Sequence, residues 1–166
     1  MTFEKEELFA TTQASGCIDV LVPRCLIGDG ANICGLPVDL EGLCSLRLSW
    51  VDGKISSIKG ISEASNIPNE ILMPRFVEPH AHIDKAFTWS RYPNLKGSYY
   101  GALEANLRNY QVRSEQDLLC SSEKSLDLAF SNGIRAIRSH VDSFGENALK
   151  DWDLLEDVRK KWQEKI

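Results

Sequence analysis

The first half of the chain alternates hydrophobic and polar residues with a period of two. Every second position from 18 to 22 is hydrophobic, and Pro23 then marks a strand end or an edge position. Residues 43–50 alternate in the same way, and Asp52-Gly53 separates them from a further short alternating segment. Such a dipeptide between alternating segments is typical of a β-hairpin. This half therefore predicts a small antiparallel β layer.

Beyond about residue 80 the hydrophobic residues recur with the period of a helix. Ser114 and Asp117 have the spacing of a capping box, and the hydrophobic stripe that follows predicts a helix that Gly133 ends. Residues 134–141 predict a strand, and residues 148–162 predict a second amphipathic helix. Residues 72–77 lead into a new strand before these elements. The resulting order of strand, helix, strand and helix indicates parallel βα units.

The predicted βα units are too few for a closed barrel. Trp152 and Trp162 lie on the hydrophobic stripe of the last helix, so we expect both in the core. A complete (β/α)8 barrel needs roughly 250 residues, and the chain has 166. We therefore expect an α/β fold in which a small antiparallel β-sandwich layer precedes a partial (β/α)8 TIM barrel, its first two βα units. We accordingly interpret the chain as the front portion of a longer protein or as a truncated product.

This interpretation divides the chain into three parts. Residues 1–16 form an N-terminal tail, residues 17–72 the β-sandwich domain, and residues 73–166 the start of the barrel domain. The 24 acidic residues outnumber the 19 basic ones, for a net charge of −5, which argues against a general nucleic-acid binder. No hydrophobic stretch approaches the roughly 18–20 residues of a membrane span, and the chain start lacks signal-peptide features. The five cysteines include no C-x-x-C pair, so we expect free thiols in a reducing, cytoplasmic setting.

The clearest candidate for chemistry is the H-x-H motif of His80 and His82, which follows a hydrophobic strand. In an extended segment residues i and i+2 face the same side, so both imidazoles point the same way. Two neutral imidazoles at one strand end can bind a shared divalent ion. Since the chain contains three histidines, we interpret this pairing as a metal-binding motif rather than a chance surface H-x-H.

Two segments resemble a known family. Residues 74–85, Pro-Arg-Phe-Val-Glu-Pro-His-Ala-His-Ile-Asp-Lys, are similar to the first barrel strand of the amidohydrolase superfamily, closest to its cytosine deaminase branch. Residues 132–142 resemble that branch's second strand, which ends in a similar Arg-Ser-His-Val-Asp sequence. The resemblance covers about residues 17–166. One departure is Arg75, where many members of the superfamily have glycine.

The resemblance implies roles only for residues that match. His80 and His82 match the metal-binding motif, with zinc or iron as the divalent ion. The family's remaining ligands and its acid/base glutamate lie on later strands, so the resemblance places no catalytic residue within this chain. Lys85 is not the carboxylated lysine of some members, which also lies on a later strand.

Further residues beside these motifs have two possible roles each. His140 either lines the substrate pocket or is a rim histidine with structural contacts. Asp142 either orients His140 or caps the next helix, and we favour the cap. Asp84 either supports a metal ligand or forms an ion pair with Lys85 or a helix. Trp89, in an aromatic loop after the first strand, either stacks on a planar substrate or packs as part of a lid.

The sequence therefore predicts part of a metal-dependent hydrolase or deaminase. By the resemblance, it acts on C–N bonds, other than peptide bonds, in a small cyclic amide or nucleobase-like substrate. No nucleic-acid or membrane partner is expected, and a homo-oligomer is possible. The alternative is a catalytically incomplete product that acts, if at all, by association with other chains, because two imidazoles do not complete a hydrolytic metal site.

Overall fold

A computed structural model describes residues 14–28, 38–61, 68–142 and 145–166. The chain divides into two compact units, Met1–Pro74 and Arg75–Ile166. Most of the predicted tail, residues 1–16, and Cys34 lie outside the described residues. No helix in the described ranges is long and apolar enough to cross a membrane.

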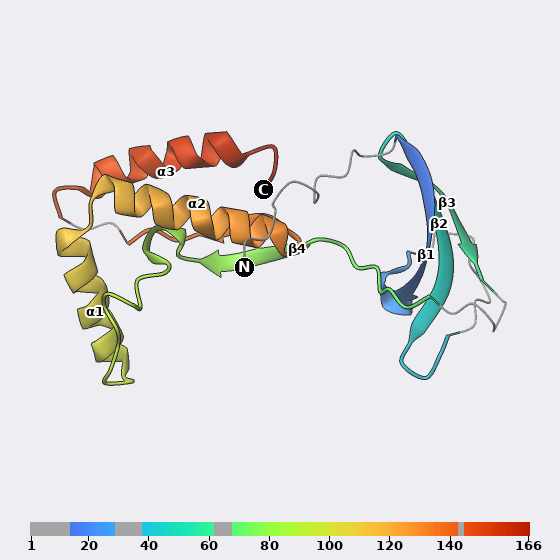
Figure 1. Ribbon diagram of the computed structural model, residues 1–166, viewed down its shortest axis with the longest axis horizontal. Helices are drawn as coiled ribbons and strands as arrows, with labels where there is room; N and C mark the ends of the chain where they lie inside the picture. Colours follow the sequence, from blue (N-terminus) through green and yellow to red (C-terminus); the bar gives the residue numbers. More distant parts are fainter. Residues whose placement is uncertain (1–13, 29–37, 62–67, 143–144) are drawn as a thin grey trace, which may run out of the picture. The chain divides into compact units, whose positions relative to one another are not determined.

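The first unit contains a three-stranded antiparallel sheet in the order β1-β2-β3 (Figure 1). Its strands are β1 (Ser15–Pro23), β2 (Leu43–Val51) and β3 (Lys54–Gly60), and a short 3-10 turn, η1 (Arg24–Leu26), follows β1. The predicted hairpin is confirmed, because Asp52-Gly53 joins β2 to β3. Both residues have positive φ, 49° and 70°, as a two-residue turn of this kind requires. Within the described residues this unit shows one sheet, so the second layer of a sandwich stays a prediction.

One face of this sheet carries the unit's core. The buried residues alternate along β1 and β2, which is the period-two pattern that predicted the strands. These buried residues form a cluster of Val20, Val22, Cys44 and Leu46. Ile27 and Ile58 pack against this cluster. Cys44 is buried as a free thiol, and the other described cysteines are also free.

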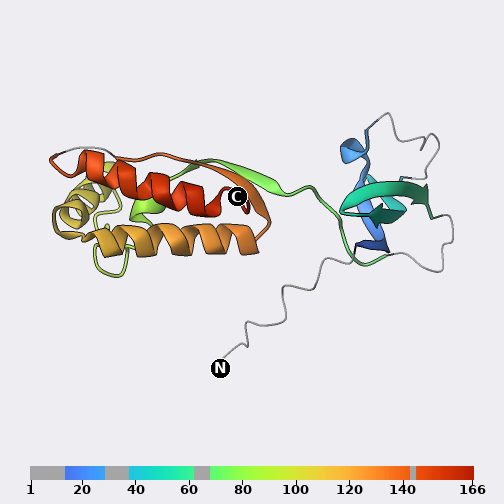
Figure 2. The same cartoon turned by 90° about the horizontal axis from the view of Figure 1, so that it is seen from above.

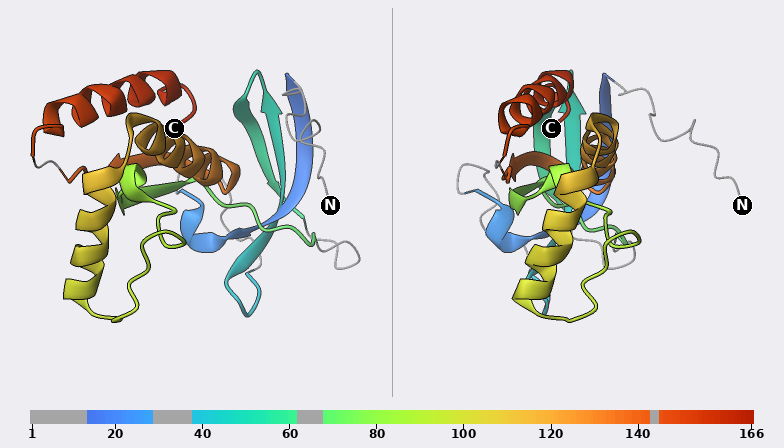
Figure 3. Two further views of the ribbon diagram at one scale, coloured as in Figure 1. Left: turned by 60° about the vertical axis from the view of Figure 1, so that its left-hand side comes forward. Right: turned by 90° about the vertical axis from the view of Figure 1, so that its left-hand side faces the viewer.

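The second unit pairs two parallel strands and covers them with helices. Strands β4 (Phe76–Ala81) and β5 (Ile134–Ser139) are parallel neighbours, as the order of elements predicted. Helices α2 (Glu115–Ser131) and α3 (Ala148–Trp162) run side by side in the same direction (Figure 2). Helix α1 (Tyr99–Val112) crosses the direction of α2 steeply (Figure 3). A 3-10 turn, η2 (Ile83–Lys85), follows β4.

Local sequence signals explain where α2 begins and ends. The predicted capping box is present: the Ser114 hydroxyl accepts a hydrogen bond from the Asp117 N–H, and the Asp117 carboxylate accepts one from the Ser114 N–H. Gly133 follows the helix with φ of 81°, a conformation that glycine adopts without strain. Between these ends, Leu118, Ser122 and Leu126 are buried at helical spacing.

The core of the second unit lies between α2, α3 and β5. Leu126, Val158 and Trp162 are buried together, and several partly buried side chains pack against them. Trp162 is 8% exposed, but Trp152 is 51% exposed, so the prediction that both are core was wrong for Trp152. Two strands span only about 10 Å, whereas two adjacent helices span about 20 Å. The described sheet is therefore too narrow to cover the whole stripe, and Trp152 lines an open, largely apolar pocket of about 330 Å³.

Candidate functional site

The fold brings all three histidines of the chain to one edge of the parallel strand pair. His80 lies in β4, His82 directly follows it, and His140 follows β5. The ring centroids of His80 and His82 are 5.5 Å apart, those of His80 and His140 are 4.0 Å apart, and those of His82 and His140 are 5.8 Å apart. Carboxyl ends of adjacent parallel strands meet at the same edge of a sheet, so residues far apart in sequence become neighbours.

Backbone hydrogen bonds hold these segments together beyond the strand ends. The His140 N–H donates to the Ala81 carbonyl at 2.7 Å, and the Ile83 N–H donates to the Ser139 hydroxyl oxygen at 3.3 Å. The strand predicted for residues 134–141 ends at Ser139, but these two contacts continue the association of the two chain segments. The backbone that carries the histidines is thus restrained from both sides.

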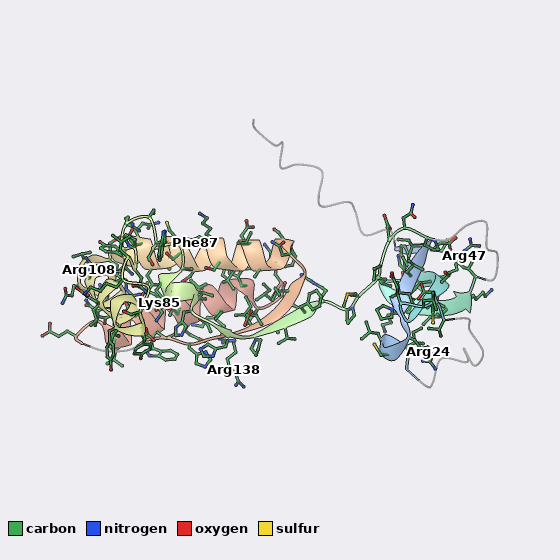
Figure 4. All side chains as sticks on the ribbon, turned by 90° about the horizontal axis from the view of Figure 1, so that it is seen from below. Arg24, Arg47, Lys85, Phe87, Arg108 and Arg138 are labelled. Carbon is green, nitrogen blue, oxygen red and sulfur yellow. The ribbon has the colours of Figure 1, made fainter. Side chains whose placement is uncertain are left out.

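Lys85 and Asp142 form an ion pair beside His82. The Lys85 Nζ donates to Asp142 Oδ2, and the other carboxylate oxygen, Oδ1, lies 3.7 Å from His82 Nδ1. That nitrogen is buried and has no hydrogen-bond partner among the described residues. The Lys85 side chain is 18% exposed (Figure 4 shows it near the end of β4 beside α1).

This position of Asp142 differs from the predicted helix cap. Helix α3 begins at Ala148, and its N-cap residue is Asn147, which makes no side-chain capping hydrogen bond. The cap interpretation was therefore wrong. Asp142 lies nearer in the chain to the strand end than to the helix, so its carboxylate meets the segment that follows β4 instead.

Asp84 belongs to a separate buried cluster. Asp84 is 2% exposed, and Arg113 Nη1 lies 3.4 Å from its Oδ2. Arg113 Nη2 also donates to Asp151 on α3 at 2.5 Å. Burial raises the pKa of Asp84, and the positive charge of Arg113 opposes that shift. Of the two ion pairs expected for Asp84, the one with Lys85 is not formed, since Lys85 pairs with Asp142. The alternative, a pair directed at a helix, is confirmed, because Asp84 pairs with Arg113, the C-cap residue of α1.

The aromatic loop after η2 is largely exposed. Trp89 is 64% exposed, and Phe87, with φ of 61°, has the Lys124 ammonium 4.2 Å from its ring centroid. The rings of Tyr99 and Tyr100 lie edge to face, with their centroids 5.7 Å apart. A substrate-stacking role for Trp89 therefore stays a prediction.

The ring separation of His80 and His82 is close to that of two imidazoles on one metal ion, and that of His80 and His140 is shorter. Two imidazoles on a tetrahedral ion, with metal–nitrogen distances of about 2.0–2.1 Å, have ring centroids about 5 Å apart. The separation of 5.5 Å between His80 and His82 is close to this value. His80 and His140 are closer, with ring planes inclined by only 31°, which is nearer to stacking. In the ranges that the structure describes, no group of three or more His, Cys, Asp or Glu side chains is arranged to hold a metal.

The surroundings of His140 favour its neutral form. Loss of hydration lowers the pKa of His140, and the positive charges that His80, His82 and Arg138 can carry lower it further. A neutral imidazole is the form that accepts hydrogen bonds or binds metals. The lowered pKa thus favours a His140 that can accept a hydrogen bond.

Sequence reasoning found the histidines and named Lys85 and Asp142, but it missed the ion pair between these two residues and the role of Arg113. Lys85 and Asp142 each follow one of the two parallel strands, so their meeting at the same edge could have been inferred from strand order. Arg113 lies at the C-terminal end of α1, and no local motif marks it as the partner of Asp84 and Asp151. Its role depends on how three elements pack.

Comparisons with known proteins identify deaminases as relatives. No family model matches the chain. The chain is 32% identical over 136 residues to a pterin deaminase of Rhizobium rhizogenes (strain K84 / ATCC BAA-868), covering 76% of this chain and 30% of that protein.

Solved structures show the same fold. Two crystal structures of 5-methylcytosine deaminase from Klebsiella pneumoniae, liganded with 5-fluorocytosine and with phosphonocytosine, match with TM-scores of 0.57 and 0.58. Each is 20% identical and covers 74% of this chain and 32% of the solved chain. The chain thus spans about a third of the length of the relatives it matches.

Proposed function

Because the chain belongs to the cytosine deaminase-like branch of the amidohydrolase superfamily, we propose that it is part of a metal-dependent deaminase. Its substrate class is a small cyclic compound with an exocyclic amino group, of nucleobase or pterin type. The names of the relatives, pterin deaminase and 5-methylcytosine deaminase, support this class. The chain corresponds to the N-terminal portion of such an enzyme.

The separation of His80 and His82 is the observation that carries this proposal. Their imidazoles converge at the carboxyl edge of a parallel strand pair, where active sites of α/β barrels form. These two side chains would hold a divalent ion, zinc or iron. A bound ion would supply an activated water for attack on an electrophilic ring carbon. His140, 4.0 Å from His80, is proposed to line the substrate pocket.

The proposed domain division follows from the proposed resemblance to barrel deaminases. Residues 17–72 form the small β domain, and residues 73–166 form the first two βα units of a (β/α)8 barrel. Parallel pairing of β4 and β5, with α2 and α3 side by side, supports the barrel geometry. The further strands that close a barrel would come from chain beyond these units.

A second candidate function is association without catalysis. In the described part of the chain, no group of three or more His, Cys, Asp or Glu side chains is arranged to hold a metal ion, and two imidazoles alone bind a divalent ion weakly. A chain of this length would then have little turnover of its own and would act through other chains.

Metal analysis and an activity screen test the proposal. We expect a chain extended by the remaining barrel strands to bind a divalent ion and to deaminate pterins or cytosines. In that chain His82→Ala should lower bound metal and reduce kcat/KM by more than about 100-fold, because even residues that only support metal ligands account for 10–100-fold. The 166-residue chain should show little or no turnover.

The matched control is Glu156→Ala, which removes an exposed side chain of α3 and should leave metal content and activity unchanged. Unaltered metal content in His82→Ala would contradict ligation by His82. Deamination at enzymatic rates by the 166-residue chain would contradict its catalytic incompleteness.

A further inference from the structure

We propose that Lys85 and Asp142 form a positioning pair that sets the orientation and the tautomer of His82. The inference rests on the proposed metal-binding role of His82, and it assigns a function to two residues outside the H-x-H motif. Lys85 follows β4, whereas Asp142 follows β5, so the pair spans both strand ends.

The contacts place Asp142 between Lys85 and His82. The Lys85 ammonium binds Asp142 Oδ2, which leaves Oδ1 directed at the imidazole, 3.7 Å from His82 Nδ1. An N–H···O hydrogen bond needs a separation of about 2.9 Å, so a movement of roughly 1 Å completes it. His82 Nδ1 is buried with no other hydrogen-bond partner in the described ranges, which makes Asp142 the acceptor within reach.

The neighbouring charges leave Lys85 available for this role. The carboxylate that precedes it, Asp84, is bound by Arg113, which also binds Asp151. Lys85 and Asp142 line a pocket of only about 10 Å³ together with Asp84, Arg113 and neighbouring residues of α1. That volume is about the minimum for one water molecule. The Lys85 side chain, 18% exposed, is thus the more confined member of the pair, and the Asp142 side chain is 39% exposed.

Holding Asp142 in place has a chemical consequence for His82. A carboxylate that accepts a hydrogen bond from Nδ1 places the imidazole proton on that nitrogen. The lone pair is then on Nε2, the atom left to bind a metal ion, and the ring is fixed in one orientation. Lys85 acts on His82 through Asp142, by restraining the carboxylate that restrains the ring.

Nuclear magnetic resonance of the metal-free 166-residue chain tests this inference directly. With 15N-labelled histidine at pH 8.5, two-bond 1H–15N correlations report the tautomer of each imidazole. We expect His82 of the unmodified chain to be mostly Nδ1–H, whereas an imidazole free in water prefers Nε2–H. A His82 that is mostly Nε2–H in the unmodified chain would overturn the proposal without any variant.

Variants separate the two members of the pair. Asp142→Ala should move His82 to mostly Nε2–H, Lys85→Met should move it part of the way, and Lys85→Arg should retain the Nδ1–H form. Asp157→Ala is the matched control, because it breaks an exposed Lys–Asp pair on α3. An unchanged His82 tautomer in Asp142→Ala, with His80 and His140 signals still at their original positions, would refute the proposal.

Metal titration distinguishes this inference from the proposed function. In the chain extended by the remaining barrel strands, Asp142→Ala should weaken zinc binding about 10–100-fold, the usual effect of losing a residue that orients a ligand. If the extended chain binds no zinc yet His82 of the 166-residue chain is Nδ1–H, the metal-binding role fails while the positioning pair stands. If zinc binds equally to both chains and the tautomer does not change, the positioning pair fails alone.

Discussion

At the scale of single residues, the capping box shows how a local hydrogen-bond pattern controls a charge. The Asp117 carboxylate accepts hydrogen bonds from the Ser114 N–H at 3.0 Å and from Arg91 at 3.0 Å. These interactions, those with Ser114 foremost, lower the pKa of Asp117 to about 2. A carboxyl group whose pKa is lowered by folding stabilises the folded state when it is ionised. The start of α2 thus depends on this negative charge.

This dependence predicts a stability difference that changes with pH. Asp117→Asn should lower the free energy of unfolding at pH 6, because the charged hydrogen bonds and the interaction with the helix N-terminus are lost. The folded pKa lies below the ordinary value of 3.8, so the difference between wild type and variant should be complete above about pH 4.5 and should shrink as the pH falls towards 2. Denaturant unfolding at several pH values measures it.

Asp127→Asn is the control for this experiment, since Asp127 is an exposed residue in the body of the same helix. The difference in free energy of unfolding between wild type and Asp127→Asn should not shrink comparably as the pH falls. A difference for Asp117→Asn that stays constant from pH 6 to pH 2 would be evidence against the capping charge.

At the scale of elements, Arg113 links segments that are distant in sequence. It is the C-cap residue of α1, and its guanidinium binds Asp84 in η2 and Asp151 in α3. Its side chain is 6% exposed, and its Cζ atom lies 4.8 Å from the centroid of the Tyr110 ring. The cluster therefore joins three elements around one buried cation, close to the turn that carries Lys85.

Removing this cation should destabilise the second unit strongly. Arg113→Met leaves two buried carboxylates without their partner, and we expect a loss of about 3–5 kcal/mol in the free energy of unfolding. Arg159→Met is the matched control: its pair with Glu156 is exposed, and such pairs contribute about 0–1 kcal/mol. Urea unfolding of both variants measures the difference. Losses of equal size would show that the buried cluster contributes no more than a surface pair.

At the scale of the whole chain, each of the two units has its own hydrophobic core. One cluster lies on the sheet of β1 and β2, and the other lies between α2, α3 and β5. Because each cluster draws its residues from one unit, we expect a cavity in one core to act mainly within that unit.

Truncation of one buried leucine in each unit tests this expectation. Leu46 is 1% exposed and Leu126 is 4% exposed, so changing either to alanine should cost about 2–5 kcal/mol in its own unit. Amide hydrogen exchange should show faster exchange in β1–β3 for Leu46→Ala and in α2, α3 and β5 for Leu126→Ala. Faster exchange across both units in either variant would show that the two unfold together.

Much of the local structure could be predicted from the sequence because its causes lie within a few residues. The Asp52-Gly53 turn, the Ser114 capping box and the glycine after α2 each depend on neighbouring backbone and side chains. The pairing of His80 with His82 is equally local, since strand geometry alone places residues i and i+2 on one face. The parallel order of β4 and β5 followed from the alternation of strands and helices.

Tertiary structure decided which distant residues meet. Strand register brings His140 to His80, and the path after each strand makes Asp142 the neighbour of Lys85 and His82 rather than a helix cap. The width of the described sheet left Trp152 exposed although its position on the hydrophobic stripe indicated burial. Periodicity specifies which face of an element is apolar, but the partner of that face depends on packing between elements. For this reason the sequence alone determined the H-x-H motif, and only the fold determined the residues that surround it.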